Sequence, residues 1–494
     1  MRGALMVCGT TSDAGKSHVT AGLCRVLHRR GVRVAPFKAQ NMSLNSYVTS
    51  TGHEIGRAQA VQAMAAGVEP EVAMNPILLK PTSETDCQMV VMGRPVAHLD
   101  AFKYHDTKLA LLPTVLDALA DLRQRFDVVI LEGAGSPAEI NLADRDIVNL
   151  PIAVAAGIKA IVIGDIERGG VFAALYGTVE LLPPEQRAAV GGFLINKFRG
   201  DPALLLDGPD ELARRTGIPV LGVLPYVTDV ALDAEDSLSF NGPLPRPGRA
   251  APTVLDVVGI RWPHLANATD LDPVAIEPGV GLRWVDHAAS LGRPDLVVLP
   301  GSKATVTDLN WLRGTGLDRA IAATDAAVLG ICGGYQALGR TIRDLDGVEA
   351  AADTMVDGLG WLDVDTEFRA AKHVAQCRGI AMGASVTGYQ IHHGRTRRAS
   401  GTDSWVALDG EAEGEGGSAP GPRFVLGTSL HGIFESDAFR RMFLTEVARR
   451  RGITFRPAAT SFAAARERQL DRLGDLVENH VDLATLSRLI EASL

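Results

Sequence analysis

The chain has 494 residues, of which 46% are hydrophobic and 22% charged, a composition that is typical of a folded globular protein and excludes disorder as its main state. It carries 49 Lys and Arg residues against 58 Asp and Glu residues, and the resulting net charge of −9 argues against nucleic acid and anionic lipid as partners. The 5 cysteines form no CxxC pair and no apolar run approaches the roughly 18 residues of a membrane span, so we expect a cytoplasmic protein without disulfides, structural zinc or a membrane partner.

Short apolar runs alternate with helical patterns in the first half of the chain. The runs cover residues 4–7, 32–37, 127–131, 160–163, 192–195 and 220–224. Such alternation is typical of βαβ units, so we expect a doubly wound α/β domain with a parallel sheet at residues 1–240. Residues 241–252 concentrate Pro and Gly, which break helices and strands, and we predict a linker there.

A second alternating series follows this linker. Its predicted strands are residues 253–260, 281–285, 296–299, 327–331 and 423–428. They predict another doubly wound α/β domain at residues 253–450, in which the Gly- and Glu-rich residues 409–422 form an exposed loop. Residues 451–494 form a predicted C-terminal helical tail, because their apolar positions have amphipathic helical spacing.

A glycine-rich loop with the sequence GTTSDAGKS occupies residues 9–17, between the first predicted strand and a helical pattern. In this arrangement the backbone N–H groups of the loop and the helix N-terminus bind phosphate, while Lys16 reaches the β- and γ-phosphates and Ser17 binds Mg²⁺. The predicted ATP contacts of the loop are Thr10, Asp13, Ala14, Gly15, Lys16 and Ser17. The loop is one residue longer than the common phosphate loop, which has Gly at position 10, and an ordinary Gly-rich turn is the alternative.

Further candidate groups follow the other predicted strands of the first domain. Glu132 ends an apolar strand, and open α/β sheets bind ligands at that edge, so we predict it as a metal ligand together with Ser17. Lys38 is placed to hold a carboxylate or a transferring phosphoryl group, and Asn196 is predicted to contact the nucleotide. Asp146 is a further acidic candidate. A solvated strand-end acid for Glu132 and surface charges for Lys38 and Asp146 are the alternatives.

The sequence GICGGYQALG at residues 330–339 places Cys332 at a predicted turn between a strand and a helix. This is the geometry of a nucleophile elbow, in which small neighbours permit a strained backbone and the helix N-terminus favours a thiolate. The N–H of Gly333 is then placed to donate to an oxyanion, and Gly301, after another predicted strand, offers a second donor. A buried structural cysteine is the alternative.

A thiol nucleophile needs a base, which usually comes from a distant segment of the chain. The sequence GTSLHGIFES at residues 427–436 follows a predicted strand and offers His431. His392 and His393 compete for this role, and a structural histidine is the alternative reading of His431.

These motifs together resemble known enzymes. Residues 330–339 and 427–436 resemble the glutaminase half of class I amidotransferases, and the phosphate loop resembles the dethiobiotin synthetase branch of P-loop enzymes. The resemblance extends over nearly the whole chain to the glutamine-hydrolysing cobyric acid synthase family, through FKAQNMSLNSYVT, ILEGAGSPAEINL, GDIERGGVFA, INKFRGD, EDSLSF and LPGSKAT.

The resemblance implies ATP-dependent amidation of the b, d, e and g carboxylates of adenosylcobyrinic acid a,c-diamide, a step of cobalamin biosynthesis that yields adenosylcobyric acid. Cys332 would attack the glutamine amide, His431 would shuttle the proton, and Gly333 with Gly301 would hold the oxyanion. In the first domain, Mg-ATP would phosphorylate a corrinoid carboxylate, and the released ammonia would displace the phosphate. The implied ligands are the corrinoid, ATP, Mg²⁺ and glutamine, and a homo-oligomer is left open.

Some positions depart from the family pattern. Many class I glutaminases have an acid two residues after the histidine, where this chain has Ile433, so we predict a Cys–His dyad rather than a triad. Gln390 and His393 stand where the family usually has Glu and Met. The rival interpretations are a cobyrinic acid a,c-diamide synthase and a non-catalytic nucleotide switch with an inactive glutaminase domain, and the presence of both Cys332 and His431 counts against the switch.

Overall fold

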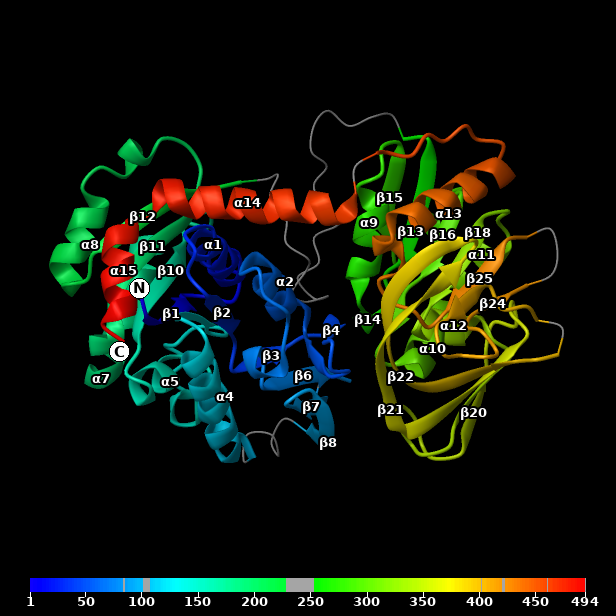
Figure 1. The fold of residues 1–494 in the computed structure, drawn as a ribbon, viewed down its shortest axis with the longest axis horizontal. Helices are drawn as coiled ribbons and strands as arrows, with labels where there is room; N and C mark the ends of the chain where they lie inside the picture. Colours follow the sequence, from blue (N-terminus) through cyan, green and yellow to red (C-terminus); the bar gives the residue numbers. More distant parts are fainter. Residues whose placement is uncertain are drawn as a thin grey trace. The chain divides into compact units, whose positions relative to one another are not determined.

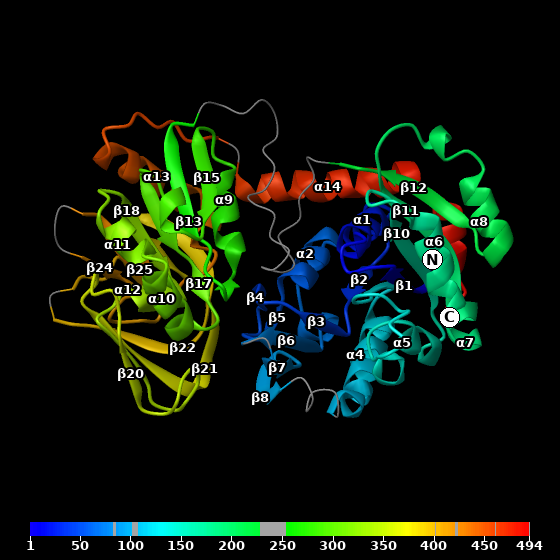
Figure 2. The same cartoon turned by 180° about the vertical axis from the view of Figure 1, so that it is seen from behind.

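The structure is a computed structural model that describes residues 1–82, 85–100, 107–227, 253–400, 402–419, 423–459 and 461–493. The chain forms two compact units, which Figure 1 and Figure 2 show from opposite sides. Unit 1 comprises Met1–Met42, Ile55–Leu232 and Arg466–Leu494, and unit 2 comprises Ser43–Glu54 and Asp233–Ala465. Residues 43–54, which we call the inserted segment, thus belong to unit 2, although unit 1 flanks them on both sides. The predicted linker at residues 241–252 lies outside the described residues.

Unit 1 is built on a six-stranded parallel sheet with the strand order β12-β11-β10-β1-β9-β2. Its strands are β1 (Gly3–Gly9), β2 (Val34–Phe37), β9 (Val128–Glu132), β10 (Lys159–Asp165), β11 (Val190–Phe198) and β12 (Val220–Pro225). Each of them overlaps a run predicted from the sequence. The strand β9 is buried at every position, as expected for a parallel sheet that is covered on both faces.

Helices cover both faces of this sheet, and the alternating side chains of β1 show it. Leu5 and Val7 pack in one apolar cluster, and Met6 and Cys8 pack in the other. The first cluster includes α1 (Lys16–Arg29), α14 (Phe462–His480) and α15 (Leu483–Glu491), so residues 466–494 complete the core of unit 1. The second includes α4 (Leu112–Arg125), α5 (Leu150–Ala155), α6 (Val171–Glu180) and α8 (Gly208–Thr216). In the described part of unit 1, α2 (Arg57–Ala65) and α7 (Pro184–Ala189) are further α-helices.

A smaller sheet of unit 1 was not predicted from the sequence. It has the order β3-β6-β7-β8, formed by β3 (Gln40–Met42), β6 (Ile77–Pro81), β7 (Asp86–Val91) and β8 (Arg94–Asp100). Close to it in the chain, β4 (Ser46–Val48) pairs with β5 (Glu54–Gly56). These strands are short and lack a regular alternation of polar and apolar residues, so no periodicity indicates them.

Unit 2 contains a second main sheet, with the order β15-β13-β16-β18-β25-β24. Its parallel strands are β13 (Leu255–Ile260), β15 (Val280–Val285), β16 (Leu296–Leu299), β18 (Ala327–Ile331) and β25 (Val425–Thr428), and β24 (Gly417–Ser418) adds an antiparallel edge. Helices cover it, among them α9 (Asp272–Ala275), α10 (Thr305–Gly314), α11 (Leu317–Ala322), α12 (Gly333–Leu338) and α13 (Asp437–Arg450). The predicted fold class of two doubly wound α/β domains is confirmed.

A long antiparallel hairpin in unit 2 was also missed by the sequence analysis. It consists of β21 (Val364–Ala381) and β22 (Ala384–Arg398), in a sheet with β19 (Thr341–Asp344), β20 (Thr354–Asp357) and β23 (Val406–Leu408).

The prediction of an exposed loop at residues 409–422 is only partly correct. Residues 409–413 are exposed, whereas Glu415–Gly417 are buried, and residues 420–422 lie outside the described part. Across the described part of the chain, none of the helices combines the length and apolar character needed to cross a membrane.

Candidate active sites

The phosphate loop connects β1 to α1 at the C-terminal edge of the unit 1 sheet. Gly15 precedes the helix with φ of 98°, and a Cβ there would lie 2.2 Å from Asn196 Nδ2, so only glycine fits. The same Asn196 nitrogen donates to the Ala14 carbonyl at 2.9 Å. The structure therefore brings Asn196 from β11 against the backbone of the predicted phosphate loop.

The other predicted residues of the loop take different positions. Lys16 is buried, and its Nζ donates to the carbonyl oxygens of Thr11 at 2.8 Å and of Gly135 at 3.0 Å. The N–H of Thr10 already donates to the Ile163 carbonyl at 2.9 Å, which ties the loop to β10. The side chain of Asp13 is exposed, 61% accessible to solvent. Lys16 is therefore held inside the loop. The N–H of Thr10 is instead bonded to β10, and the side chain of Asp13 is exposed to solvent.

Glu132 is the centre of a buried polar cluster at the end of β9. Its Oε1 accepts hydrogen bonds from Ser17 Oγ and from Lys38 Nζ, both at 2.9 Å, and its Oε2 accepts one from Gln62 Nε2. Lys38 and Glu132 are 4% and 0% exposed at their side chains, which excludes both the solvated acid and the surface lysine considered from the sequence. The hydroxyl of Ser17 beside a carboxylate forms a pair of hard oxygen donors, and this pair fits Mg²⁺ shared with nucleotide phosphates.

Asp146 holds a turn next to this cluster. Its Oδ1 accepts hydrogen bonds from the N–H groups of Val148 at 2.7 Å and of Asn149 at 3.0 Å. Asn149 Nδ2 in turn donates to the Ala134 carbonyl at 2.9 Å. Asp146 therefore supports the loop after β9, and the Gly135 carbonyl of that loop contacts Lys16 of the predicted phosphate loop. The sequence analysis did not identify Gln62 or Asn149.

Cys332 lies at the turn from β18 to α12 in a strained backbone conformation, with φ of 51° and ψ of −107°. The turn is close-packed. A Cβ on Gly334 would lie 1.8 Å from the Leu299 carbonyl, and one on Gly333 would lie 2.7 Å from the N of Ser302. Glycine at both positions is thus a steric requirement of the elbow.

The predicted partners of Cys332 converge around this turn. A Cβ on Gly301 would lie 3.0 Å from His431 Cε1, so the imidazole rests against the backbone after β16. Ser302, the next residue, lies against Gly333, because a Cβ on Gly333 would be 2.7 Å from the backbone N of Ser302. The structure therefore brings together Cys332, Gly333, Gly301 and His431 from three separate segments of unit 2.

An acid that the sequence analysis missed supports His431. Asp270 Oδ2 lies 2.7 Å from His431 Nδ1, and Asp270 Oδ1 accepts a hydrogen bond from the N–H of Gly432 at 2.8 Å. Tyr389 stacks on the imidazole, with 5.4 Å between the ring centroids, and exchanges two backbone hydrogen bonds with His431. Ile433, two residues after the histidine, is apolar and buried, so it provides no acid. The acid beside His431 is Asp270, from a distant part of the sequence.

The protonation of His431 follows from this environment. Burial by itself lowers the pKa of His431, but the charge of Asp270, the interactions with Cys332 and the hydrogen bond to Asp270 outweigh it and raise the pKa to about 10. His431 therefore carries a proton at neutral pH beside the Cys332 thiol. A protonated imidazole in that position can donate its proton to a leaving group.

The two competing histidines have other surroundings. Burial, and then the neighbouring His373, lower the pKa of His392 to about 3, so its ring is neutral. Neither ring nitrogen of His392 has a hydrogen-bond partner among the described residues. His393 Nδ1 lies 3.1 Å from the Arg369 carbonyl. The contact with Asp270 and the interaction with Cys332 distinguish His431 from these two histidines.

A cavity of about 790 Å³ lies beside this constellation in unit 2. Its wall includes Tyr335, three residues after Cys332, and Ser429, two residues before His431. Gln390 and His392 also line it, and they flank Ile391, whose carbonyl is 3.9 Å from Cys332 Sγ. The rest of the wall is charged: Arg395, Arg397, Arg398, Glu411, Glu413 and Glu415.

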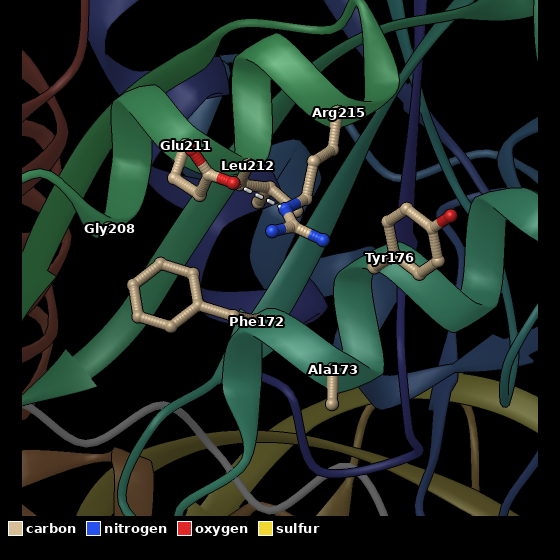
Figure 3. Close-up of a pocket in the computed structure, with 7 residues that line it drawn as sticks. All are labelled: Phe172, Ala173, Tyr176, Gly208, Glu211, Leu212 and Arg215. Atoms are coloured by element: carbon tan, nitrogen blue, oxygen red, sulfur yellow. Dashed lines mark hydrogen bonds and ion pairs between the residues drawn. The ribbon is translucent and has the colours of Figure 1, made fainter.

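Unit 1 contains a separate apolar cavity of about 370 Å³ between α6 and α8, which Figure 3 shows. Phe172 and Tyr176 approach it from α6, and Leu212 approaches it from α8 beside the Glu211–Arg215 ion pair. Its lining contains none of the residues predicted to bind the nucleotide.

Two family models match the chain. Residues 5–240 match the CobQ/CobB/MinD/ParA nucleotide binding domain, and residues 256–439 match the CobB/CobQ-like glutamine amidotransferase domain. The predicted order of a nucleotide-binding domain followed by a glutamine amidotransferase domain is thereby confirmed.

Curated relatives match over the full length. Cobyric acid synthase of Rhodococcus jostii (strain RHA1) is 52% identical over 500 aligned residues, which cover 99% of this chain and 96% of that protein. Cobyric acid synthase of Saccharopolyspora erythraea is 53% identical over 497 residues, covering 99% and 94%. The protein of the same name from Streptomyces coelicolor is 52% identical over 502 residues, covering 100% and 97%.

Proposed function

The chain belongs to the cobyric acid synthase family, and from this membership we propose that it transfers ammonia from glutamine to the b, d, e and g carboxylates of adenosylcobyrinic acid a,c-diamide. The enzyme is thus a glutamine-hydrolysing ligase of cobalamin biosynthesis. The observation that carries the proposal is the convergence of a cysteine elbow with an Asp270–His431 pair in the unit matched by the amidotransferase domain.

Glutamine hydrolysis is proposed to begin at Cys332. Its thiolate attacks the side-chain carbonyl carbon of glutamine, and the N–H groups of Gly333 and Gly301 stabilise the oxyanion that forms. When the carbon–nitrogen bond breaks, the His431 imidazolium donates its proton and ammonia leaves. The now neutral His431 takes a proton from water, and the hydroxide attacks the thioester carbonyl. Glutamate and one proton are released, and Cys332 returns to the thiolate beside the protonated His431.

The charged cavity beside Cys332 suits the amino acid end of glutamine. A zwitterion needs a cation for its α-carboxylate and an anion for its α-ammonium group. The cavity wall offers three arginines and three glutamates, and its polar side chains Gln390 and Ser429 lie next to the elbow. We therefore place glutamine in this cavity with its side-chain amide directed to Cys332.

ATP is proposed to bind at the phosphate loop of unit 1. Lys16 contacts the β- and γ-phosphates, and the backbone after Thr10 surrounds them at the N-terminus of α1. Ser17 and Glu132 would hold Mg²⁺, which when bound neutralises the phosphate charge. Lys38, the buried cation beside Glu132, orients the substrate carboxylate or the γ-phosphoryl group.

The corrinoid carboxylate then attacks the γ-phosphorus, and ADP leaves. Ammonia adds to the acyl carbon of the resulting acyl phosphate, inorganic phosphate departs, and the amide remains after loss of a proton. One ATP and one glutamine are consumed for each amide formed. Positioning is the main contribution of the protein in this scheme, because the phosphoryl transfer itself needs no covalent intermediate on the enzyme.

The test is mass spectrometry of adenosylcobyrinic acid a,c-diamide after incubation with the protein, Mg-ATP and glutamine. Each amidation replaces a carboxyl OH by NH₂, and the proposal expects four successive replacements. Amidation of cobyrinic acid with no change of the a,c-diamide would transfer the assignment to an a,c-diamide synthase. No change of any corrinoid would contradict the proposed activity altogether.

A further inference from the structure

The inserted segment packs into unit 2 through buried polar residues. Asn45, Ser46 and Glu54 are fully buried, although they leave the body of unit 1 after β3 and return to it at β5. A segment held by apolar contacts alone can shift, whereas buried polar groups need their hydrogen-bond partners in place. The partners of this segment therefore show what it positions.

One set of partners belongs to the turn that carries Asp270. The N–H of Ser46 donates to Asn267 Oδ1 at 2.8 Å, and the N–H of Ala268 donates to Asn45 Oδ1 at 3.3 Å. Asn267 has a left-handed conformation, with φ of 53°, and it precedes the short 3₁₀ helix η5 (Ala268–Leu271), which contains Asp270. The inserted segment thus bonds to Asn267, the strained residue at the start of the turn that carries Asp270.

A second partner is the aromatic residue that stacks on His431. Tyr389 donates its hydroxyl hydrogen to the Ser46 carbonyl at 3.0 Å. Its ring lies against the imidazole at an interplanar angle of 24°, and its backbone pairs with that of His431. Ser46 therefore contacts Asn267, where the Asp270 turn begins, through its N–H, and Tyr389 through its carbonyl.

The far end of the segment is attached to β21. Gln376 Nε2 donates to the Val48 carbonyl at 2.9 Å, and Lys372 forms an ion pair with Glu54 at 2.5 Å. Glu54 also accepts a hydrogen bond from Ser46 Oγ at 2.8 Å. The segment is thus anchored on both sides of Ser46.

We propose that Asn45 and Ser46 are positioning residues of the glutaminase, which hold the Asp270 turn and Tyr389 so that His431 is correctly placed against Cys332. This inference rests on the proposed function. It also means that the residues of unit 2 that follow the inserted segment in sequence contain the proposed catalytic residues but not all of the groups that position them. Lys38 of the nucleotide site lies seven positions before Asn45, so one short stretch of sequence serves both sites.

The test compares two variants that each remove one contact. Asn45→Ala removes the acceptor for Ala268 N–H, and Tyr389→Phe removes the hydrogen bond to Ser46 while it keeps the ring on His431. For each variant, kcat and KM for glutamine hydrolysis are measured, together with the pH profile of Cys332 alkylation by iodoacetamide and amidation with ammonium chloride. Thr51→Ala is the matched control, because Thr51 is an exposed residue of the same segment.

We expect kcat for glutamine hydrolysis to fall about tenfold in each variant, the size of one lost hydrogen bond, while KM for glutamine stays near the wild-type value. The alkylation profile shifts to higher pH, because a displaced Asp270 no longer holds the proton on His431. Among the described residues, the titratable groups around His431 are Asp270, Cys332, His392 and Tyr389. Asn45→Ala is expected to change only the position of Asp270 relative to the ring, whereas Tyr389→Phe also removes the Tyr389 hydroxyl. Ammonia-dependent amidation and the Thr51→Ala control remain at the wild-type level.

Wild-type kcat and an unchanged alkylation profile in both variants would overturn the inference. A parallel loss of glutamine-dependent and ammonia-dependent amidation would also overturn it, since that loss indicates a general structural effect. If Asn45→Ala does not fold, Tyr389→Phe decides the question alone. A failure of the proposed function is distinguishable, because the wild-type protein would then lack both reactions.

Discussion

Asp270 and His431 are 161 positions apart in the sequence, and a carboxylate oxygen of the first lies 2.7 Å from Nδ1 of the second. Because this contact occupies Nδ1, Nε2 is the imidazole nitrogen that remains for the thiol. The second oxygen of Asp270 accepts the N–H of Gly432, so the carboxylate is fixed on both sides. The ring orientation of the predicted base thus depends on a residue from another part of unit 2.

Replacing Asp270 by Asn tests this dependence through pH. The folded-state pKa of His431, about 10, lies above its value in an unfolded chain, so the pair stabilises the protein fully below about pH 6.5 and loses this contribution as the pH rises through 10. In Asp270→Asn the carboxylate charge is gone and the pKa of His431 falls. We expect glutamine hydrolysis to slow roughly 100-fold at neutral pH, and alkylation of Cys332 to begin at higher pH.

The control for this variant is Asp286→Asn, which breaks an exposed Asp286–His287 pair elsewhere in unit 2. Iodoacetamide alkylation followed by mass spectrometry gives the pH profile of both variants. An Asp270→Asn profile that coincides with the wild-type one would show that Asp270 does not govern the protonation of His431.

Cys332→Ser is expected to abolish glutamine-dependent amidation and to leave ammonia-dependent amidation intact. The hydroxyl of serine is a much poorer nucleophile than a thiolate, whereas the phosphate loop is untouched. Rates with glutamine and with ammonium chloride are compared by mass spectrometry of the corrinoid. Cys377→Ser, at a half-buried cysteine on β21, should keep both rates. Loss of both reactions in a folded Cys332→Ser protein would contradict the assignment of separate sites.

Glu132→Gln is expected to abolish amidation with either nitrogen donor, by at least about 100-fold, because it removes a proposed Mg²⁺ ligand. It also leaves the buried Lys38 without its counter-charge, so we expect a loss of about 3 kcal/mol in the free energy of unfolding. Alkylation of Cys332 should continue at the wild-type rate.

Chemical denaturation and the amidation assay measure these two effects. Glu139→Gln, at an exposed position of the loop after β9, is the matched control and should behave like the wild type. Ser17→Ala disturbs the cluster less and separates catalysis from stability. Full amidation activity in Ser17→Ala and Glu132→Gln would exclude both residues as metal ligands.

The main parts of the fold could be predicted because parallel strands are buried on both faces. All six strands of the unit 1 sheet, and the five parallel strands of the unit 2 sheet, are apolar runs followed by a turn. The phosphate loop and the elbow at Cys332 were predictable for a related reason, since each needs glycine at fixed positions. Gly15 and Gly334 meet that need in the structure, where a Cβ would collide with Asn196 or with the Leu299 carbonyl.

What the sequence analysis missed depends on contacts between distant segments. Asp270 stands in an ordinary turn, and nothing within a few residues of it indicates a histidine partner. Gln62 reaches Glu132 from a helix whose sequence shows no chemical motif. Residues 43–49 of the inserted segment belong to a motif that resembles the family, but the membership of the segment in unit 2 follows from tertiary hydrogen bonds to Asn267 and Tyr389.

The elbow also allows a stability test. Gly334→Ala places a Cβ 1.8 Å from a backbone oxygen that cannot move without displacing β16, so we expect a loss of about 3 kcal/mol or more. Gly314→Ala is the matched control: this glycine ends α10 and a Cβ there meets nothing within 4 Å. Alanine should be neutral or stabilise the protein by up to about 1 kcal/mol at that site. Thermal unfolding of both variants measures the difference, and equal effects would refute the steric account of the elbow.

The helices α14 and α15 have a consequence for how the protein is made. Leu473 and Ile490 are fully buried in the same cluster as Leu5 of β1, and a Cβ on Gly22 of α1 would lie 2.8 Å from the Leu473 carbonyl. The ribosome synthesises residues 466–494 after the whole of unit 2. Unit 1 therefore cannot complete its core during its own translation, and the glutaminase half is made, and can fold, before the nucleotide-binding half is finished.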